Sequence, residues 1–354
     1  MNLRPIASVL TVLFAACQGG PTSEPAPVPE PPAQRSVTVY MYSDYIDPEL
    51  LTAFEQTTGI DLRLDVYETT EDMMAKLKQS PGQYDVVVVS DHAIPLLART
   101  GALAPLDKAK IRNLGNLDAR FLNPPYDPGN AWSLPYQWGT MGLMYRKDRV
   151  PALEPTWGVV LEAARQPGPL VLIDSMRDMM AAALIYQGRS VNSHDPAELK
   201  AAGDAILAAK TDKVVGFEGG VGGVKRVLAG DATLAIVYNG DAIREPDPNV
   251  DFVIPREGTI IWMDAMTLVA GSSHQDEAYA FIDYILDAEV GAALSNWNRY
   301  PTPNAASLPS ITPEDRANPI IYPPDEVVAK MEYLADVGED TRLYDEIWTG
   351  IKAR

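Results

Sequence analysis

The chain has 354 residues and a formal net charge of −19 at pH 7, and this length is enough for about two domains. The acidic excess argues against nucleic acid and anionic membrane surfaces as partners, because both are themselves negatively charged. Hydrophobic residues make up 46% of the chain and charged residues 22%, which are ordinary values for a globular protein.

The N-terminal segment predicts export and a lipid anchor. Arg4 precedes an apolar run over residues 9–16 that is too short to span a bilayer. The single cysteine, Cys17, follows this run directly, which looks like a bacterial lipoprotein signal. We therefore expect residues 1–17 to be a signal peptide that ends at a lipidated Cys17. The alternative is an ordinary secretory signal with an incidental cysteine, since Phe14 stands where Leu is more usual.

Residues 18–35 are rich in proline and cannot build an apolar core. Such a composition favours extended polyproline conformations. We expect this segment to be a tether between the lipid and the globular part of the protein.

From residue 36 onward, β-rich segments alternate with helical ones. Several of these strands are continuous apolar runs, which is typical of a parallel sheet that is covered on both faces. In such sheets ligands bind beyond the carboxyl ends of the strands. The first set comprises expected strands at 37–41, 60–67 and 85–90, and expected helices at 48–58 and 71–78.

A second alternating set follows a loop-rich passage at 113–133. Two such sets predict two lobes with a cleft between them. The expected strands lie at 141–145, 170–173, 234–238 and 258–269. The expected helices lie at 176–186, 196–209, 274–286, 288–297, 323–334 and 343–352.

The strand expected at 258–269 carries a carboxylate, Asp264, in an otherwise apolar run. A buried carboxylate needs a cation, hydrogen-bond donors or water, because isolation in an apolar environment costs several kcal/mol. Trp262 lies two residues earlier, on the same face of the strand, and its ring also attracts cations. This pair indicates a site for an organic ammonium, or a core Trp beside an Asp that pairs with an Arg or Lys of the protein.

The sequence lacks the patterns of an enzyme or a metal site. The only cysteine is at the expected anchor, and the three histidines (His92, His194 and His274) form no zinc-ligand spacing. There is no G-x-S-x-G elbow. The glycine-rich segment 218–225 lacks the Gly-Lys-Ser/Thr ending of a phosphate loop, so we expect a turn before a short helix. We predict a protein that is not an enzyme and needs no cofactor or metal.

Acids, aromatics and small polar residues recur at the expected strand ends. Carboxylates bind ammonium groups through charge-assisted hydrogen bonds, while aromatic walls pack an alkyl chain and attract its charge. The candidate binding residues are Tyr42, Asp44, Tyr45, Ser90, His92, Ser175, Asp178, Tyr238, Asp241, Trp262 and Asp264.

An ordered series of segments resembles the bacterial spermidine/putrescine-binding periplasmic proteins, the substrate receptors of polyamine ABC importers within the extracellular solute-binding proteins of family 1. No single segment is diagnostic, but together they span nearly the whole mature chain. The segments are 42–46, 54–60, 84–90, 105–110, 134–139, 238–241, 262–264, 300–304 and 321–324.

This resemblance implies the α/β, two-lobe periplasmic-binding-protein fold (type II), in which each lobe is a mostly parallel sheet flanked by helices. Lobe 1 would comprise residues 36–139 plus 263–305, and lobe 2 residues 140–262 plus 306–354. Hinge strands between the lobes are implied near residues 138–140, 262–264 and 303–306.

The resemblance also implies a function. The protein would be a monomeric periplasmic receptor that captures putrescine, cadaverine or spermidine in the interlobe cleft and delivers it to an ABC transporter permease. Its membrane contact would be the lipid anchor alone. Three alternatives stay open: a polyamine-sensing module for a membrane signalling protein, the same fold with a different small cationic ligand, and a site for a sugar or peptide. In the last case the acids would pair with protein cations such as Arg177.

Residue roles are implied in the same way. Aromatic walls are implied for Tyr42, Tyr238, Trp262 and Tyr300. The central carboxylate would be Asp264, and Asp178 would bind one ammonium end. The remaining pocket positions would be Asp44, Tyr45, Ser90 and His92.

The chain departs from the family pattern at positions that bear on the ligand. Tyr replaces Trp at Tyr42 and Tyr238, Ser175 replaces an Asp of spermidine receptors, and Leu334 replaces a ligand-contacting Gln. Asp241 matches an acid that is typical of putrescine receptors. These departures favour putrescine or cadaverine over spermidine.

Overall fold

The computed structural model of the protein describes residues 35–219 and 221–353. Residues 35–354 form one compact unit. The expected signal peptide with Cys17, and the expected tether apart from Arg35, lie outside the described residues.

The described residues contain ten strands that follow the order β2-β1-β3-β10-β5-β8-β6-β7, with β4 paired to β10 and β9 paired to β5. β1 is parallel to β2 and β3, and β6 is parallel to β7 and β8. β5 and β10 run antiparallel to their neighbours. The strands are β1 (Ser36–Tyr42), β2 (Asp61–Tyr67), β3 (Val86–Ser90), β4 (Leu103–Ala104), β5 (Ser133–Arg146), β6 (Leu170–Ile173), β7 (Val214–Glu218), β8 (Leu234–Tyr238), β9 (Val250–Val253) and β10 (Ile261–Val269).

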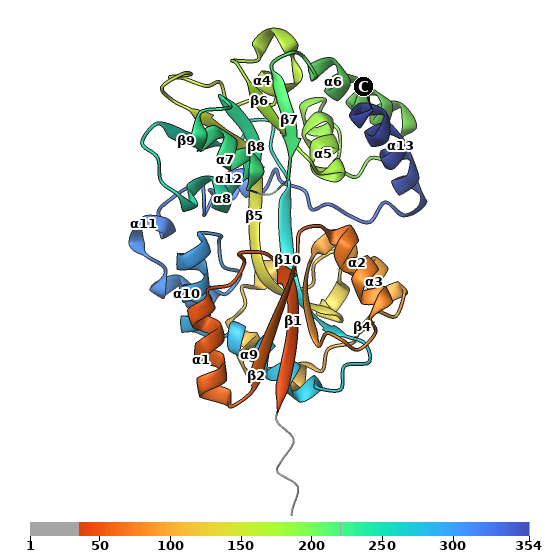
Figure 1. Ribbon diagram of the computed structural model, residues 1–354, viewed down its shortest axis with the longest axis vertical. Coiled ribbons are helices and arrows are strands. Elements are labelled where there is room, and N and C mark those ends of the chain that lie inside the picture. Colours follow the sequence, from red (N-terminus) through yellow and green to blue (C-terminus); the bar gives the residue numbers. More distant parts are fainter. Residues whose placement is uncertain (1–34, 220, 354) are drawn as a thin grey trace, which may run out of the picture. The chain divides into compact units, whose positions relative to one another are not determined.

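The long strand β5 joins the two halves of this arrangement (Figure 1). Its first part pairs with β10, and its second part pairs with β8 and β9. The sequence predicted only the second part, because Pro135 and Gly139 discourage a strand. Pairing with β10 overrides that local preference, and Pro135 lies opposite Ala265 beside a register shift.

Helices cover both faces of each half (Figure 1). Around the β1–β3 half lie α1 (Pro48–Thr58), α2 (Thr70–Gln79), α3 (Ile94–Arg99), α9 (Gln275–Ile285) and α10 (Ala288–Asn298). Around the β6–β8 half lie α4 (Gly158–Leu161), α5 (Met176–Tyr186), α6 (Pro196–Ala209), α7 (Gly222–Ala229), α8 (Asn239–Arg244) and α13 (Thr341–Lys352). Two further short helices are α11 (Pro313–Arg316) and α12 (Asp325–Val328).

Most expected helices are confirmed, and α1 shows the local reasons. Its N-cap Asp47 accepts a hydrogen bond from the Glu49 backbone N–H at 2.9 Å, and Pro48 occupies the first turn. Gly59 ends the helix in the left-handed region at φ 66°.

The expected helix at 323–334 is wrong except for one turn, because α12 comprises only Asp325–Val328. The following segment pairs with the start of β10 instead, where the Ile261 backbone N–H donates to the Glu332 carbonyl at 3.1 Å. The elements expected from the sequence also include neither β7 nor α8. For the segment after α12 and for β7, pairing with another segment decides the structure, since β7 pairs with β6.

The apolar strands are buried on both faces. On β3, Val86 and Val88 pack on one side with α1 and α9, while Val87 and Val89 pack on the other with α2 and α3. This explains the unbroken valine run, because neither face of β3 meets water.

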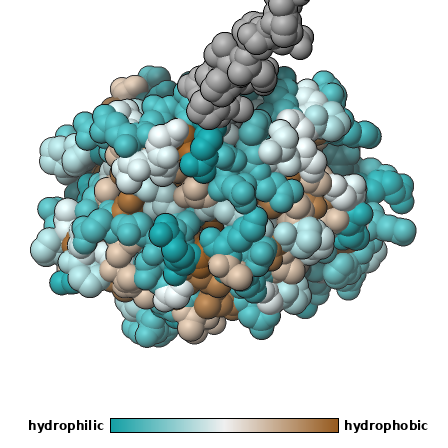
Figure 2. All heavy atoms as spheres, turned by 90° about the horizontal axis from the view of Figure 1, so that it is seen from below, coloured by the Kyte–Doolittle hydropathy of each residue, from teal (hydrophilic) through white to brown (hydrophobic). Residues whose placement is uncertain are grey.

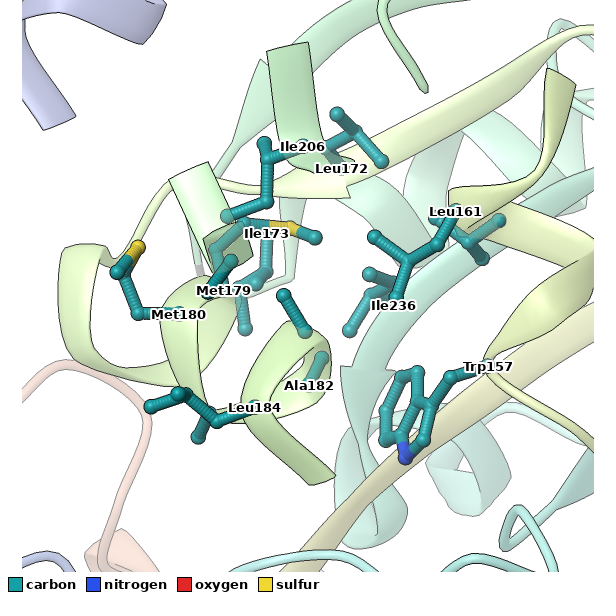
Figure 3. Packing of buried hydrophobic residues seen from close by; sticks show 14 of the residues in the cluster. Trp157, Leu161, Leu172, Ile173, Met179, Met180, Ala182, Leu184, Ile206 and Ile236 are labelled. Atoms are coloured by element: carbon teal, nitrogen blue, oxygen red, sulfur yellow. The ribbon is translucent and has the colours of Figure 1, made fainter. Parts of the chain in front are cut away.

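In the β6–β8 half, Trp157 is fully buried among Ile236, Met179 and neighbouring aliphatic side chains (Figure 3). Its indole N–H donates to the Gly258 carbonyl at 2.9 Å. The ring therefore ties this core to the segment that leads into β10.

The molecular surface seen from below in Figure 2 is mostly hydrophilic, with apolar side chains in small groups. Within residues 35–219 and 221–353, no helix combines the length and apolar character that a membrane crossing requires.

We expect Trp157→Ala to lower the free energy of unfolding by about 3–5 kcal/mol, because it leaves a large cavity and an unpaired buried carbonyl. Urea unfolding followed by circular dichroism measures this change. Leu64→Ala, on the exposed side of β2, is the control and should cost under about 1 kcal/mol. Equal small losses in both variants would show that the Trp157 cluster does not support the fold.

Candidate functional site

Asp264 lies in the middle of β10, opposite Ser90 on β3 and Gln137 on β5. Its side chain is only 7% exposed. One carboxylate oxygen, Oδ2, accepts a hydrogen bond from the Tyr45 hydroxyl at 2.7 Å, and Oδ1 accepts one from the Ser90 hydroxyl at 2.7 Å. Both donors are neutral, so they orient the carboxylate without cancelling its charge.

Burial raises the pKa of Asp264 from its ordinary value of 3.8 to about 6. The hydrogen bonds from Tyr45 and Ser90 oppose this shift, and the charge of Asp91 adds to it. The carboxylate is therefore destabilised in this site, and a cation beside it would relieve that cost.

Tyr42, at the end of β1, extends the hydrogen-bond chain. Its hydroxyl lies 3.0 Å from Ser90 Oγ and 3.0 Å from Thr70 Oγ1. Because Ser90 donates its proton to Asp264, Tyr42 donates to Ser90 and accepts from Thr70. Sequence reasoning missed Thr70, because a helix-start threonine is ordinarily a capping residue.

A second buried acid is Asp178, in the first turn of α5. It accepts a hydrogen bond from the Tyr238 hydroxyl at 2.6 Å. Burial raises the pKa of Tyr238 well above its ordinary value, and the Asp178 charge adds to the shift. The Tyr238 proton therefore stays in place, and the pair presents a carboxylate beside an aromatic wall.

Trp262 lies between two of the predicted aromatic walls. Its ring centre is 5.8 Å from that of Tyr238 and 5.0 Å from that of Tyr300, with the ring planes steeply inclined in both pairs. Two glycines make room for these rings. A Cβ atom at Gly139 would lie 2.3 Å from the Trp262 ring, and one at Gly240 would lie 2.5 Å from the Tyr300 ring.

Asp241 is half-buried at the start of α8. Burial raises its pKa, the Arg244 charge and the Tyr300 hydroxyl lower it, and the Asp44 charge raises it. Asp44 itself is exposed in the left-handed region at φ 52°. Its backbone carbonyl, and not its carboxylate, accepts a hydrogen bond from Arg244 at 3.2 Å.

His92 pairs with a buried acid that sequence reasoning missed, Asp91. The His92 Nδ1 lies 3.5 Å from Asp91 Oδ1, and the other oxygen of Asp91 accepts from the Met263 backbone N–H at 3.2 Å. Burial lowers the pKa of His92, but the hydrogen bond and charge of Asp91 outweigh it and raise the pKa. Only the pairing of β3 with β10 reveals that Asp91 reaches this region.

Ser175, an expected pocket residue, and Leu334, one of the departures from the family pattern, form no hydrogen bond with the hydroxyl–carboxylate network in the described part of the chain. Ser175 is the half-buried N-cap residue of α5, and its side chain does not cap the helix. Leu334 packs in the apolar core of the β6–β8 half.

Arg177 forms no ion pair with the neighbouring acid, Asp178. It donates to the Ala335 carbonyl at 2.9 Å and to Asn192 Oδ1 at 2.9 Å, and it lies over the Tyr344 ring. Among the residues that the structure describes, no Lys or Arg forms an ion pair with Asp178, Asp241 or Asp264. The same part of the chain holds no cluster of three metal-ligating side chains.

Known proteins are similar to this chain over most of its length. Residues 49–320 match the family described as bacterial extracellular solute-binding protein. A putrescine/cadaverine-binding protein of Pseudomonas aeruginosa is 34% identical over 337 residues, which cover 91% of this chain and 95% of the relative. The spermidine/putrescine-binding periplasmic protein of Escherichia coli is 33% identical over 321 residues, covering 89% of this chain and 92% of the relative.

Solved structures agree with these matches. The spermidine/putrescine ABC transporter substrate-binding protein of Streptococcus pneumoniae superposes with a TM-score of 0.80 at 28% identity, covering 90% of this chain and 99% of its own. The resemblance seen in the sequence and the expected two-lobe periplasmic-binding-protein fold are thereby confirmed.

The raised pKa of Asp264 predicts a pH dependence of the ligand-free protein. In the folded protein the Asp264 carboxyl holds its proton more tightly than the ordinary pKa of 3.8 implies. Protonation of Asp264 therefore contributes fully to the free energy of unfolding below pH 4, and this contribution is lost as the pH rises through about 6. The loss amounts to roughly 3 kcal/mol by linkage.

The Asp264→Asn variant has no titrating group at this position. The melting temperature of the variant minus that of the original protein should therefore increase as the pH rises from 4 to 7. Differential scanning calorimetry measures the difference. Asp212→Asn, at an exposed position, is the control. A pH-independent difference for Asp264→Asn would contradict the raised pKa.

Proposed function

Because the chain belongs to the family of bacterial extracellular solute-binding proteins, we propose that it is the polyamine receptor of an ABC importer. The observation that carries this proposal is the Asp264 carboxylate, which is buried, bonded to two neutral hydroxyls and raised in pKa. Relatives at 33–34% identity that are named for putrescine, cadaverine and spermidine support the choice of ligand class.

In the proposed complex Asp264 neutralises one ammonium group, and Asp178 or Asp241 neutralises the other. The alkyl chain packs between the rings of Tyr42, Tyr238, Trp262 and Tyr300, and each cation–π contact contributes about 0.5–2 kcal/mol. The side chains of Asp44, Tyr45, Ser90, His92 and Ser175 complete the pocket. This assignment is supported by the short hydroxyl–carboxylate contacts at Asp264 and Asp178.

A diamine fits this set of residues better than spermidine. Leu334 packs in the apolar core and offers no polar contact, and Ser175 carries no charge. A triamine would leave an ammonium without either partner, whereas Asp264 with Asp178 or Asp241 suffices for putrescine or cadaverine. The Pseudomonas relative named for putrescine and cadaverine supports the same preference.

The pocket is proposed to lie between lobe 1 (36–139 plus 263–305) and lobe 2 (140–262 plus 306–354). Asp264, Tyr45 and Tyr300 are almost fully buried, so ligand entry requires the lobes to separate. The hinges are proposed near 138–140, 262–264 and 303–306, and the passage of β5 from β10 to β8 supports the first of them.

The remaining parts of the proposal concern the setting of the receptor. The family is bacterial and extracellular, and we propose a periplasmic monomer that is held to the membrane by lipid on Cys17. It would deliver its ligand to an ABC transporter permease, without catalysing a reaction. Labelling with a fatty-acid analogue, which Cys17→Ala should abolish, tests the anchor.

The first test is a thermal-shift panel on the purified protein with putrescine, cadaverine, spermidine, spermine, sugars and amino acids. A ligand that binds only the folded state raises the melting temperature by several degrees at saturating excess. We expect the largest shift with putrescine or cadaverine. A larger shift with spermidine would overturn the diamine preference, and no shift with any polyamine would overturn the receptor assignment.

Asp264→Asn should weaken the binding of the preferred polyamine at least 100-fold, because the ammonium is then desolvated without its countercharge. Isothermal titration calorimetry at pH 7.5 measures the dissociation constant. Asp212→Asn, at an exposed position, is the matched control and should bind normally. Undiminished affinity in Asp264→Asn would exclude the proposed role of this residue.

A further inference from the structure

Gln137 stands directly across from Asp264 in the antiparallel pairing of β5 with β10. Residues that are opposite each other in such a pair project to the same face of the sheet. Ser90 is opposite Asp264 on the other side, in β3. The three side chains therefore form a row across three strands, with the Asp264 carboxylate in the middle.

The two flanking members of this row differ in their bonding. Ser90 donates to Asp264 at 2.7 Å. The Gln137 side chain is 0% exposed, yet neither its Oε1 nor its Nε2 has a hydrogen-bond partner among the described residues. In that part of the chain, Gln137 is the one buried amide whose oxygen and nitrogen are both unpaired.

A buried amide without partners is costly, because both of its polar atoms have lost water. Gln166 shows the usual solution in the same protein. Its Nε2 donates to the Val160 and Ala209 carbonyls at 2.9 and 2.7 Å, and its Oε1 accepts from Thr211 at 2.6 Å. Gln137 thus has the burial of a structural glutamine and none of its bonds, which points to a partner that arrives from outside the chain.

We propose that Gln137 is a ligand-contacting and specificity-determining residue, whose Oε1 accepts a hydrogen bond from the ammonium that Asp264 neutralises. This inference rests on the proposed function and extends it. The carboxylate supplies the countercharge, and the amide oxygen supplies a second, uncharged acceptor on the same face.

The ligand end at Asp264 must then offer more than one N–H. A primary ammonium has three N–H groups and satisfies both acceptors, whereas a tertiary ammonium has one and leaves the amide unpaired. Gln137 therefore selects for an unsubstituted amine end. The ring of Trp262 is the apolar, cation-attracting wall next to this end of the ligand. Its buried Nε1 also has no partner among the described residues.

The test compares Gln137→Met with the original protein by isothermal titration calorimetry, using putrescine and N,N,N′,N′-tetramethylputrescine. Met conserves the volume and removes the amide. We expect the affinity for putrescine to fall about tenfold and the preference for putrescine over its tetramethyl form to shrink by a similar factor. The melting temperature of the ligand-free variant should rise by about 2–4 °C, because an unpaired buried amide is removed.

Gln166→Met is the matched control, because it removes a buried amide whose bonds are satisfied. It should lower the melting temperature of the ligand-free protein and leave the affinity for putrescine within about twofold. Gln137→Glu keeps an acceptor in place, so it should bind putrescine more tightly than Gln137→Met does.

The outcomes separate this inference from the proposed function. If the original protein binds no polyamine, the proposed function fails first. If it binds putrescine and Gln137→Met binds equally well, or loses melting temperature as Gln166→Met does while keeping its amine preference, Gln137 is a structural residue and the inference is overturned.

Discussion

The Asp264 carboxylate is buried on a strand that is paired on both sides, where little water can reach its charge. β10 pairs with β3 on one side and with β5 on the other, and its neighbours are buried on both faces. The Tyr45 and Ser90 hydroxyls donate to the carboxylate, and each of these two residues is itself held by a further hydrogen bond. The Tyr136 hydroxyl donates to the Tyr45 backbone carbonyl at 2.7 Å, and Tyr42 lies 3.0 Å from Ser90. The carboxylate thus stands at the centre of a rigid polar network.

This network lowers the cost of a buried carboxylate without neutralising it. Hydroxyl donors offset part of the desolvation, while the nearby charge of Asp91 works against ionisation. The Asp178 carboxylate repeats the pattern in the other half, where Tyr238 is its donor. No Lys or Arg of the described residues forms an ion pair with either carboxylate, so both are available to the cation of the proposed complex. The excess of acidic residues in the chain adds to this attraction at longer range.

The sheet topology explains why the hydroxyl donors and the aromatic rings of the candidate site lie near one another. Tyr42, Ser90 and Tyr238 are the last residues of β1, β3 and β8, and ligands of such sheets bind at the carboxyl ends of strands. The glycines at 139 and 240 let the Trp262 and Tyr300 rings lie against the backbone, which shapes the walls between the two halves.

The alternation of strands and helices, the capped start of α1, the valine-rich β3 and the placement of Trp262 and Asp264 on one strand could be predicted from the sequence, because each depends on residues that are near one another in the chain. The full length of β5, the extended segment after α12 and the surroundings of Asp91 and Gln137 could not be predicted in this way, because they depend on tertiary contacts. Their positions follow from pairing between segments that are far apart in the chain, and no local pattern encodes which side chains such a pairing brings together.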